Sequence, residues 1–261
     1  MDSAVIGSEP GSSHQEARRD STAERFAQLA VDLHESAGVD ETVDAVVSFA
    51  LQALDCSHAG VALVVSGGRL EIPAVTDPFV AEIYRFQLDG GDGPLVDAMR
   101  KHATVLVRDT ATDDRWPDWA ARLLDLGVRS VLDLPLTTAS GTVGALGLYN
   151  TEPDAFGPDE EAVGQILARH ASVAVASARR ETSLAQAVDA RKLVGQAMGI
   201  LMERYHLEED QAFAVLRRYS QDTNAKLRDV AEHLIETRKL PAEARQPRAG
   251  RADERVRGDR A

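Results

Sequence analysis

Apolar residues in the first two thirds of the chain recur with two different periods. Runs with an apolar position every three or four residues predict amphipathic helices, and short alternating runs predict strands. In chain order the pattern predicts helices over 22–37 and 39–54, a strand hairpin over 59–66 and 70–76, helices over 78–88 and 95–102, a strand over 104–109, a helix closed by Gly127, strands over 128–136 and 141–150, and a long helix from Pro158. Together they predict one α+β domain with a central, largely antiparallel sheet and flanking helices.

The last third of the chain has a helical period alone. Its apolar residues form three consecutive stripes with spacings of three and four: Leu184, Val188, Val194, Ala197, Met198, Leu201 and Tyr205, then Ala212, Phe213, Leu216 and Tyr219, then Leu227, Val230, Ala231, Leu234 and Ile235. Three short amphipathic helices of this kind can close a small core. We therefore expect an all-α, three-helix domain after the α+β domain.

No Pro- or Gly-rich linker separates the two predicted domains. The helical pattern continues almost unbroken from Pro158 to about Tyr205, but the heptad register along it passes through polar residues. A homodimeric coiled coil over this stretch therefore stays open as one of two alternatives. Gly195 and Gly199 reduce the bulk of one face of the helix, which we interpret as close packing against the next two helices, with a contact between two copies of the chain as the alternative.

The net charge of −13 is divided unevenly along the chain. Residues 1–183 carry a net charge of −15, residues 184–240 hold nine Lys or Arg and nine Asp or Glu, and residues 241–261 carry +2. Such an uneven distribution of charge indicates that the parts of the chain have different roles. We expect four parts: a disordered leader over 1–21, the α+β domain over 22–180, the helical domain over 181–240 and a disordered Arg-rich tail over 241–261.

Bulk features exclude several classes of protein. No apolar run reaches the roughly 18 to 20 residues of a membrane helix, and we expect no signal peptide and no membrane association. Cys56 is the one cysteine, which excludes an internal disulfide and fits a reducing cytoplasm. Cys56 and His58 invite comparison with bilin or haem sites, but the junction of a helix and a strand favours a buried, structural thiol.

A cluster of cations and small polar side chains surrounds the turn after the second predicted helix of the last domain. The candidates for nucleic-acid contact are Arg217, Arg218, Ser220, Thr223, Asn224, Lys226 and Arg228, together with Arg191 and Lys192 on the preceding helix. Cations neutralise phosphates, while amides and hydroxyls read base edges. The structural alternatives are a solvated face paired with Asp222 and Asp229, and Asn224 as the N-cap of the third helix.

The last domain closely resembles the ANTAR domain, an RNA-binding module of transcription antitermination. The matching segments are "GQAMGILMER", "AFAVLRRYSQDTN" and "LRDVAEHLI", in the right order and spacing over about fifty residues. One departure is Glu208, which stands where such domains often have a Ser or Thr that caps the second helix. The resemblance implies binding of stem-loops in leader transcripts, in which unpaired loop bases carry the sequence information.

The first domain is similar to GAF sensor domains. This resemblance rests on "AGVALVV", "DGPLVDAMRKHATVLVRD", "DDRWPDW", "VRSVLDLPL" and "GTVGALGLYN". It implies a small-molecule pocket beside the sheet, for which the candidate lining residues are Phe79, Tyr84, Trp116 and Trp119. A core role for both tryptophans is the alternative.

Motifs of catalysis are missing from the sequence. It contains no Walker loop, no HExxH and no nucleophile elbow, and "DGGDGP" lacks the Lys and the Ser or Thr of a phosphate loop. We therefore predict no enzymatic activity, no cofactor and no metal site. The expected function is a homodimeric, cytoplasmic RNA-binding antitermination regulator under GAF control. The alternative is a signalling module whose helical end binds a protein partner.

Overall fold

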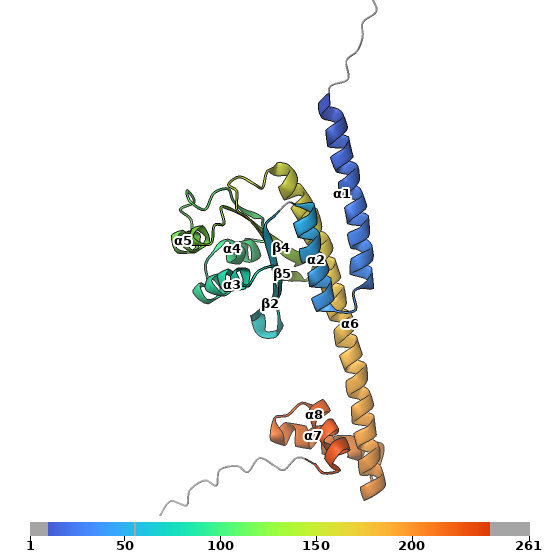
Figure 1. Cartoon of the computed structure of the whole chain (residues 1–261). Helices are drawn as coiled ribbons and strands as arrows, with labels where there is room; N and C mark the ends of the chain where they lie inside the picture. The colour runs from blue at the N-terminus through green and yellow to red at the C-terminus, as the bar shows by residue number, and fades with distance from the viewer. Residues whose placement is uncertain (1–9, 55, 241–261) are drawn as a thin grey trace, which may run out of the picture. The chain divides into compact units, whose positions relative to one another are not determined.

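The computed structural model describes residues 10–54 and 56–240, and it divides into two compact units between Thr182 and Ser183. In chain order the elements are α1 (Pro10–Glu35), α2 (Val39–Ala53), β1 (His58–Val64), η1 (Ser66–Gly68), β2 (Leu70–Val75), α3 (Pro78–Gly90), α4 (Pro94–Lys101), β3 (Val105–Val107), α5 (Pro117–Asp125), β4 (Ser130–Thr138), β5 (Gly141–Asn150), α6 (Pro158–Tyr205), α7 (Glu209–Thr223) and α8 (Leu227–Thr237) (Figure 1).

The two predicted disordered ends have different outcomes. Helix α1 begins at Pro10, so residues 10–21 of the expected leader are helical. Proline fits the first turn of a helix, where its missing N–H has no intrahelical acceptor to lose. Residues 1–9 of the leader and the expected tail over 241–261 lie outside the described residues.

A five-stranded sheet forms the centre of the first unit. Its strand order is β2-β1-β5-β4-β3, and every neighbouring pair is antiparallel. The β1–β2 hairpin turns at Gly67 and Gly68, whose φ angles of 81° and 74° are positions that glycine adopts without steric cost. The predicted α+β class with a largely antiparallel sheet is confirmed.

Each face of the sheet has its own core because strand side chains alternate. Leu132, Leu134 and Leu136 of β4 face α1, α2 and the first part of α6, where the buried Cys56 also packs. Val131 of β4 and Tyr149 of β5 face α3, α4 and α5 on the other side (Figure 1). The sheet is therefore covered by helices on both faces.

The second unit packs the end of α6 against α7 and α8. Its fully buried residues are Ala197, Leu201, Ala212, Leu216, Val230, Ala231 and Leu234. The predicted stripes supply all seven, but the first stripe also contains residues that the core does not use. Leu184 and Val188 are 68% and 58% exposed, because α6 contributes to this second core only from Leu193 onward.

The expected packing role of Gly195 and Gly199 is wrong. A Cβ added at either residue would meet no heavy atom within 4 Å, so neither glycine is required for a close approach. Both instead line an open groove between α6 and the two helices that follow, described below.

Candidate nucleic-acid interface

All nine residues predicted to contact nucleic acid lie in the second unit. Arg191 and Lys192 are on α6, Arg217, Arg218, Ser220 and Thr223 are on α7, Asn224 follows α7, Lys226 precedes α8 and Arg228 is in the first turn of α8. We call the six cations of this set the cationic surface.

The cations of this surface are exposed and almost all lack a carboxylate partner. Arg218 lies 3.5 Å from Asp222, one helical turn further along α7. Within the described residues, no other member of the cationic surface makes an ion pair, although Asp229 is close to Arg228 in sequence. The alternative of a face neutralised by Asp222 and Asp229 therefore accounts for one cation only.

The two predicted hydroxyl groups hold the protein's own turn together. Ser220 Oγ donates to the carbonyl of Ala225 at 2.7 Å, and Thr223 Oγ1 donates to the carbonyl of Tyr219 at 2.6 Å. Both side chains are half-buried. Their donor protons are thus committed within the protein, and their evident role is to shape the turn that carries the cations.

Asn224 ends α7 and is not the N-cap of α8. Its φ of 52° and ψ of 28° are left-handed, a conformation that asparagine tolerates at a helix C-terminus better than most residues do. Lys226 is the residue that precedes α8, two positions later than we expected. The Asn224 side chain is exposed and its amide is not used as a helix cap.

The N-terminus of α8 combines positive charge with an uncapped helix end. The N-cap residue Lys226 makes no side-chain cap, and Arg228 follows in the first turn beside one acid, Asp229. The first N–H groups of a helix lack intrahelical acceptors and attract anions. A lysine here forgoes the stabilisation that Ser, Asp or Asn would give, and the position is well suited to a phosphate group.

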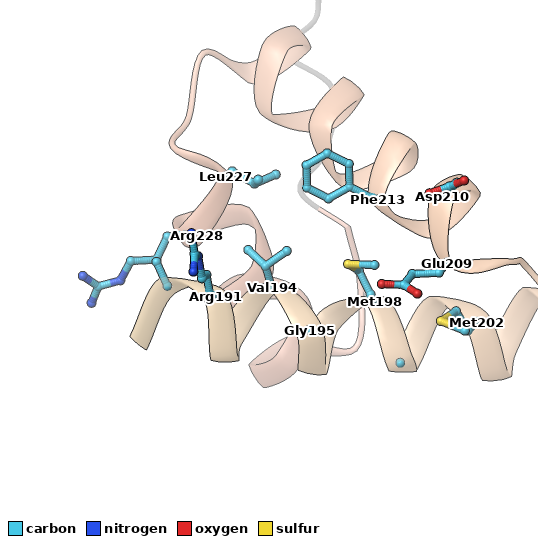
Figure 2. A pocket seen from close by; sticks show the side chains of 12 residues that line it. Arg191, Val194, Gly195, Met198, Met202, Glu209, Asp210, Phe213, Leu227 and Arg228 are labelled. Carbon is cyan, nitrogen blue, oxygen red and sulfur yellow. The ribbon is translucent and has the colours of Figure 1, made fainter. Parts of the chain in front are cut away.

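Arg191 and Arg228 come from different helices and meet at one end of a groove. The groove has a volume of about 680 Å³ and runs between α6, α7 and the start of α8 (Figure 2). It is lined by Ala190, Arg191, Val194, Gly195, Met198, Gly199, Met202, Glu209, Asp210, Phe213, Leu227 and Arg228. No spacing of residues within a single helix predicts that these two arginines lie near each other, because they belong to α6 and α8.

Phe213 is a residue of this groove that the sequence pattern assigned to the core. Its side chain is 39% exposed, and the ring lies across the groove from Val194 and Met198 (Figure 2). The position fits the apolar stripe of α7, but that helix buries Ala212 and Leu216 more deeply. Helix α7 has more apolar residues than the roughly two buried positions per turn that a short amphipathic helix needs. This excess is the sequence signal that could have marked Phe213 as exposed.

Glu208 begins α7 with a hydrogen-bonded cap. The side chain of Gln211 accepts from the backbone N–H of Glu208 at 3.1 Å, one half of a capping box. The departure from Ser or Thr at this position therefore leaves the helix start with an alternative cap.

The four residues predicted to line a ligand pocket are part of the second core of the first unit. Tyr84, Trp116 and Trp119 are buried, while Phe79 is half-buried and packs against the same cluster. The two tryptophan rings contact each other edge to face, with centroids 6.1 Å apart. This is the core role that we kept as the alternative for the tryptophans.

Polar atoms without partners gather in that same core. Among the described residues, the buried side-chain atoms with no hydrogen bond include Gln87 Nε2, Trp119 Nε1 and both carboxylate oxygens of Asp133. Burial raises the pKa of the Asp133 carboxyl well above its usual range. Burial also raises the pKa of Tyr84, with a further increase from the charge of Asp133.

These polar groups converge above one glycine of β5. A Cβ added at Gly147 would lie 2.5 Å from Tyr84 Oη, 2.6 Å from Asp133 Oδ1 and 3.1 Å from Tyr149 Oη. Tyr84 Oη accepts from the Gly147 N–H at 3.0 Å and donates to the Gly60 carbonyl at 2.6 Å. Glycine is required here because any side chain would enter the polar cluster.

Two broader searches of the described residues set limits on other sites. No helix within them is both long enough and apolar enough to pass through a membrane. No three His, Cys, Asp or Glu side chains within them are grouped so that they could hold a metal ion.

The chain thus consists of a helix-covered antiparallel sheet followed by a small helical unit with exposed cations, five of which have no ion-pair partner among the described residues. Residues 36–176, more than half of the chain, match the family model of the GAF domain, and the chain therefore belongs to the GAF domain family. Residues 182–235 match the ANTAR domain. The chain thus has the GAF–ANTAR architecture that the sequence resemblance predicted.

Two solved structures illustrate what the first unit is similar to. The GAF domain of a phosphoenolpyruvate-protein phosphotransferase from Coxiella burnetii is 17% identical, with a TM-score of 0.51 over 62% of this chain and 96% of that one. A free methionine-R-sulfoxide reductase from Neisseria meningitidis, in complex with its substrate, is 15% identical, with a TM-score of 0.48 over 69% and 99%. A search of curated proteins found no match. At these identities the first of the two structures supports the fold alone.

Proposed function

We propose that this protein is an RNA-binding transcription antitermination regulator. Its ANTAR domain binds tandem stem-loops in the leader of a nascent transcript and holds a form of the RNA that cannot make the terminator hairpin. Transcription then continues past the terminator. The role requires binding and release only, so it needs no catalytic group.

The observation that carries this proposal is the set of unpaired cations in the ANTAR domain. Of the six cations of the cationic surface, five are exposed without an ion-pair partner among the described residues. Phosphate contacts from such side chains supply most of the sequence-independent affinity for nucleic acid. A chain with a net charge of −13 can bind RNA only where its cations are exposed and unpaired, and in this proposal the cationic surface supplies them.

A homodimer fits both the expected RNA and the exposed residues of α6. Leu184 and Val188 lie one turn apart on α6 and are 68% and 58% exposed. Large apolar side chains that are exposed on neighbouring turns favour association with another helix. Two copies that engage two stem-loops gain affinity through effective concentration. Light scattering of the Leu184→Ser, Val188→Ser variant tests this, since a wild-type dimer should become a monomer.

The signal that controls RNA binding is sensed by the GAF domain in this proposal. The region between the sheet and α3, α4 and α5 contains Phe79, Tyr84, Trp116 and Trp119, together with the unpartnered carboxylate of Asp133. Buried polar atoms without partners are uncommon in native proteins and mark places where a polar ligand group gains hydrogen bonds. A bound ligand couples to RNA binding to the extent that it favours one state of the protein, typically by 1–3 kcal/mol.

Crosslinking and sequencing of the transcripts bound to the protein in its native cell tests the proposed function. Recovery of tandem stem-loops that precede terminators is the expected result. Transcripts without paired stem-loops, or no enrichment over an Arg217→Ala, Lys226→Ala, Arg228→Ala variant, would contradict it. Capture of a protein at the helical end in place of RNA would favour the protein-interaction alternative.

A further inference from the structure

The groove on the ANTAR domain has an apolar centre that is open to solvent. Phe213 presents a ring that is 39% exposed, and Met198 and Met202 of α6 are half-buried beside it. The floor is formed at Gly195 and Gly199, where an added Cβ would have nothing within 4 Å. The volume of about 680 Å³ lies within the range of pockets that hold small organic molecules.

The two ends of the groove have opposite charge. Arg191 and Arg228 lie at one end, next to Leu227 and Val194 (Figure 2). Glu209 and Asp210 lie at the other end, at the start of α7 (Figure 2). All four charged side chains are exposed, and none makes an ion pair among the residues that the structure describes.

We propose that this groove holds one unpaired loop base of the bound RNA, with the Phe213 ring stacked on the base. Arg191 and Arg228 contact the phosphates that flank this nucleotide. A carboxylate of Glu209 or Asp210 accepts a hydrogen bond from an amino group of the base. The inference rests on the proposed function, since it assigns to RNA binding a site outside the predicted turn.

The chemistry of the groove matches a nucleotide at each of its three parts. Unstacked bases of single-stranded RNA pack on aromatic side chains, and this contact tolerates any base. Unpaired arginines suit phosphates, and their forked donors can bind two oxygens at once. Adenine, cytosine and guanine offer a carboxylate an amino group with two N–H donors, whereas uracil offers only its single N3–H, so the acidic end favours the amino-bearing bases.

A protein helix is the other class of occupant, and the exposed residues of α6 make it the weaker choice. Exposed apolar surface for a second copy lies at Leu184 and Val188, neither of which lines the groove. Within the groove, the exposed large apolar side chain is Phe213 alone among the described lining residues. One exposed ring between charged ends is a better match to one base than to the apolar stripe of a helix.

The test uses the full chain and a pool of RNA hairpins that share one stem and have a randomised loop. Hairpins selected by the wild type are titrated against Phe213→Ala, Phe213→Trp and Gly195→Leu. Gly195→Leu fills the floor and also replaces glycine by a better helix former, so its fold is retained. Gln186→Leu is the matched control, because Gln186 is exposed on α6 away from Leu184 and Val188 and lies outside the groove.

Affinity should fall roughly five- to hundred-fold for Phe213→Ala, the usual loss when one base–aromatic contact is removed. Gly195→Leu should show a similar loss, while Phe213→Trp and Gln186→Leu should bind like the wild type. At one loop position uracil should be depleted, and the combined Glu209→Ala, Asp210→Ala variant should remove that depletion.

The possible outcomes distinguish a failure of the groove proposal from a failure of the proposed function. If the wild type selects no hairpin from the pool, the proposed function itself fails. If it selects hairpins that Phe213→Ala and Gly195→Leu bind equally well, the groove proposal is overturned and RNA binding stands. If those two variants keep RNA affinity but lose self-association in light scattering, the groove is a contact between copies and the base-binding proposal is overturned.

Discussion

Replacement of Lys226 by Asp should stabilise helix α8 and, at the same time, weaken the binding of RNA. Lys226 is the N-cap residue of α8 and makes no side-chain cap. Its backbone is extended, with φ −64° and ψ 142°, the conformation from which an aspartate side chain reaches the N–H groups of the first turn. The Lys226→Asp variant thus supplies a cap and removes a cation from the cationic surface.

The expected gain in helix stability is about 1 kcal/mol from the cap, a central value for N-cap replacements. Exchange of a positive for a negative charge beside the helix N-terminus adds roughly 0.3–1 kcal/mol at low ionic strength. The two contributions together, about 1.3–2 kcal/mol, should slow local opening roughly ten- to thirty-fold. For RNA, the loss of one phosphate contact should flatten the plot of log affinity against log salt by about one phosphate's contribution.

Hydrogen exchange followed by mass spectrometry on the full chain measures the first effect over residues 227–237. Filter binding of selected stem-loop RNA at several salt concentrations measures the second. Lys226→Gln is the matched control, because glutamine removes the charge without the short side-chain acceptor that caps a helix well. It should reproduce the change in salt slope and leave the exchange of α8 amides close to that of the wild type.

The combined result distinguishes a functional cation from a structural one. Slower exchange with unchanged RNA affinity would show that Lys226 does not face the RNA. Faster exchange in Lys226→Asp would refute the capping argument. The start of α8 would then depend on the left-handed Asn224 and the turn, and not on a side-chain cap at residue 226. A general loss of protection in the domain would show that Lys226 packs in a way that its exposure does not suggest.

Three further predictions concern the cores and the turn. Asp133→Asn should stabilise the first unit increasingly as pH rises. Because the pKa of Asp133 is raised in the folded state, the contribution of its carboxyl to folding stability is complete below the unfolded-state pKa of about 3.9 and is lost as pH rises through the folded-state pKa. Urea unfolding at pH 5 and pH 8 should show this divergence, and equal differences at both pH values would contradict it. Gly147→Ala should cost about 1–3 kcal/mol of unfolding free energy by overpacking, whereas Gly90→Ala at the end of α3, with nothing within 4 Å, should cost nothing. Thermal melts that rank the two alike would refute the role of Gly147 in the polar cluster. Ser220→Ala should cost about 0.5–1.5 kcal/mol through loss of the hydrogen bond to Ala225, and unchanged α8 hydrogen exchange would count against that bond.

The spacing of apolar residues predicted most of the fold, because each buried face of a strand or helix requires apolar residues at regular intervals. Leu132, Leu134 and Leu136 alternate with residues of the opposite core, as a strand between two helix layers requires. The limits of the pattern appear where a helix is longer than its partners. Leu184 and Val188 continue the apolar period of α6, and period alone does not reveal which positions have a neighbour.

The candidate site was predictable in composition and only partly in arrangement. Charge and polarity identified the residues around the turn, but Asn224 can end one helix as well as begin another, and the choice depends on a backbone angle. The hydroxyls of Ser220 and Thr223 were open to either base readout or turn formation, and their donors are used within the turn. The groove joins residues of three helices, so its existence depends on packing that no single segment encodes.

The salt dependence of RNA binding tests the central claim most directly. Filter binding of the full chain to selected stem-loop RNA should give an affinity that falls linearly on a log–log plot as salt rises. Arg217→Ala and Lys226→Ala should each flatten that line by about one phosphate's contribution. An affinity that does not change with salt, or slopes that these variants leave unaltered, would contradict the assignment of the cationic surface to RNA.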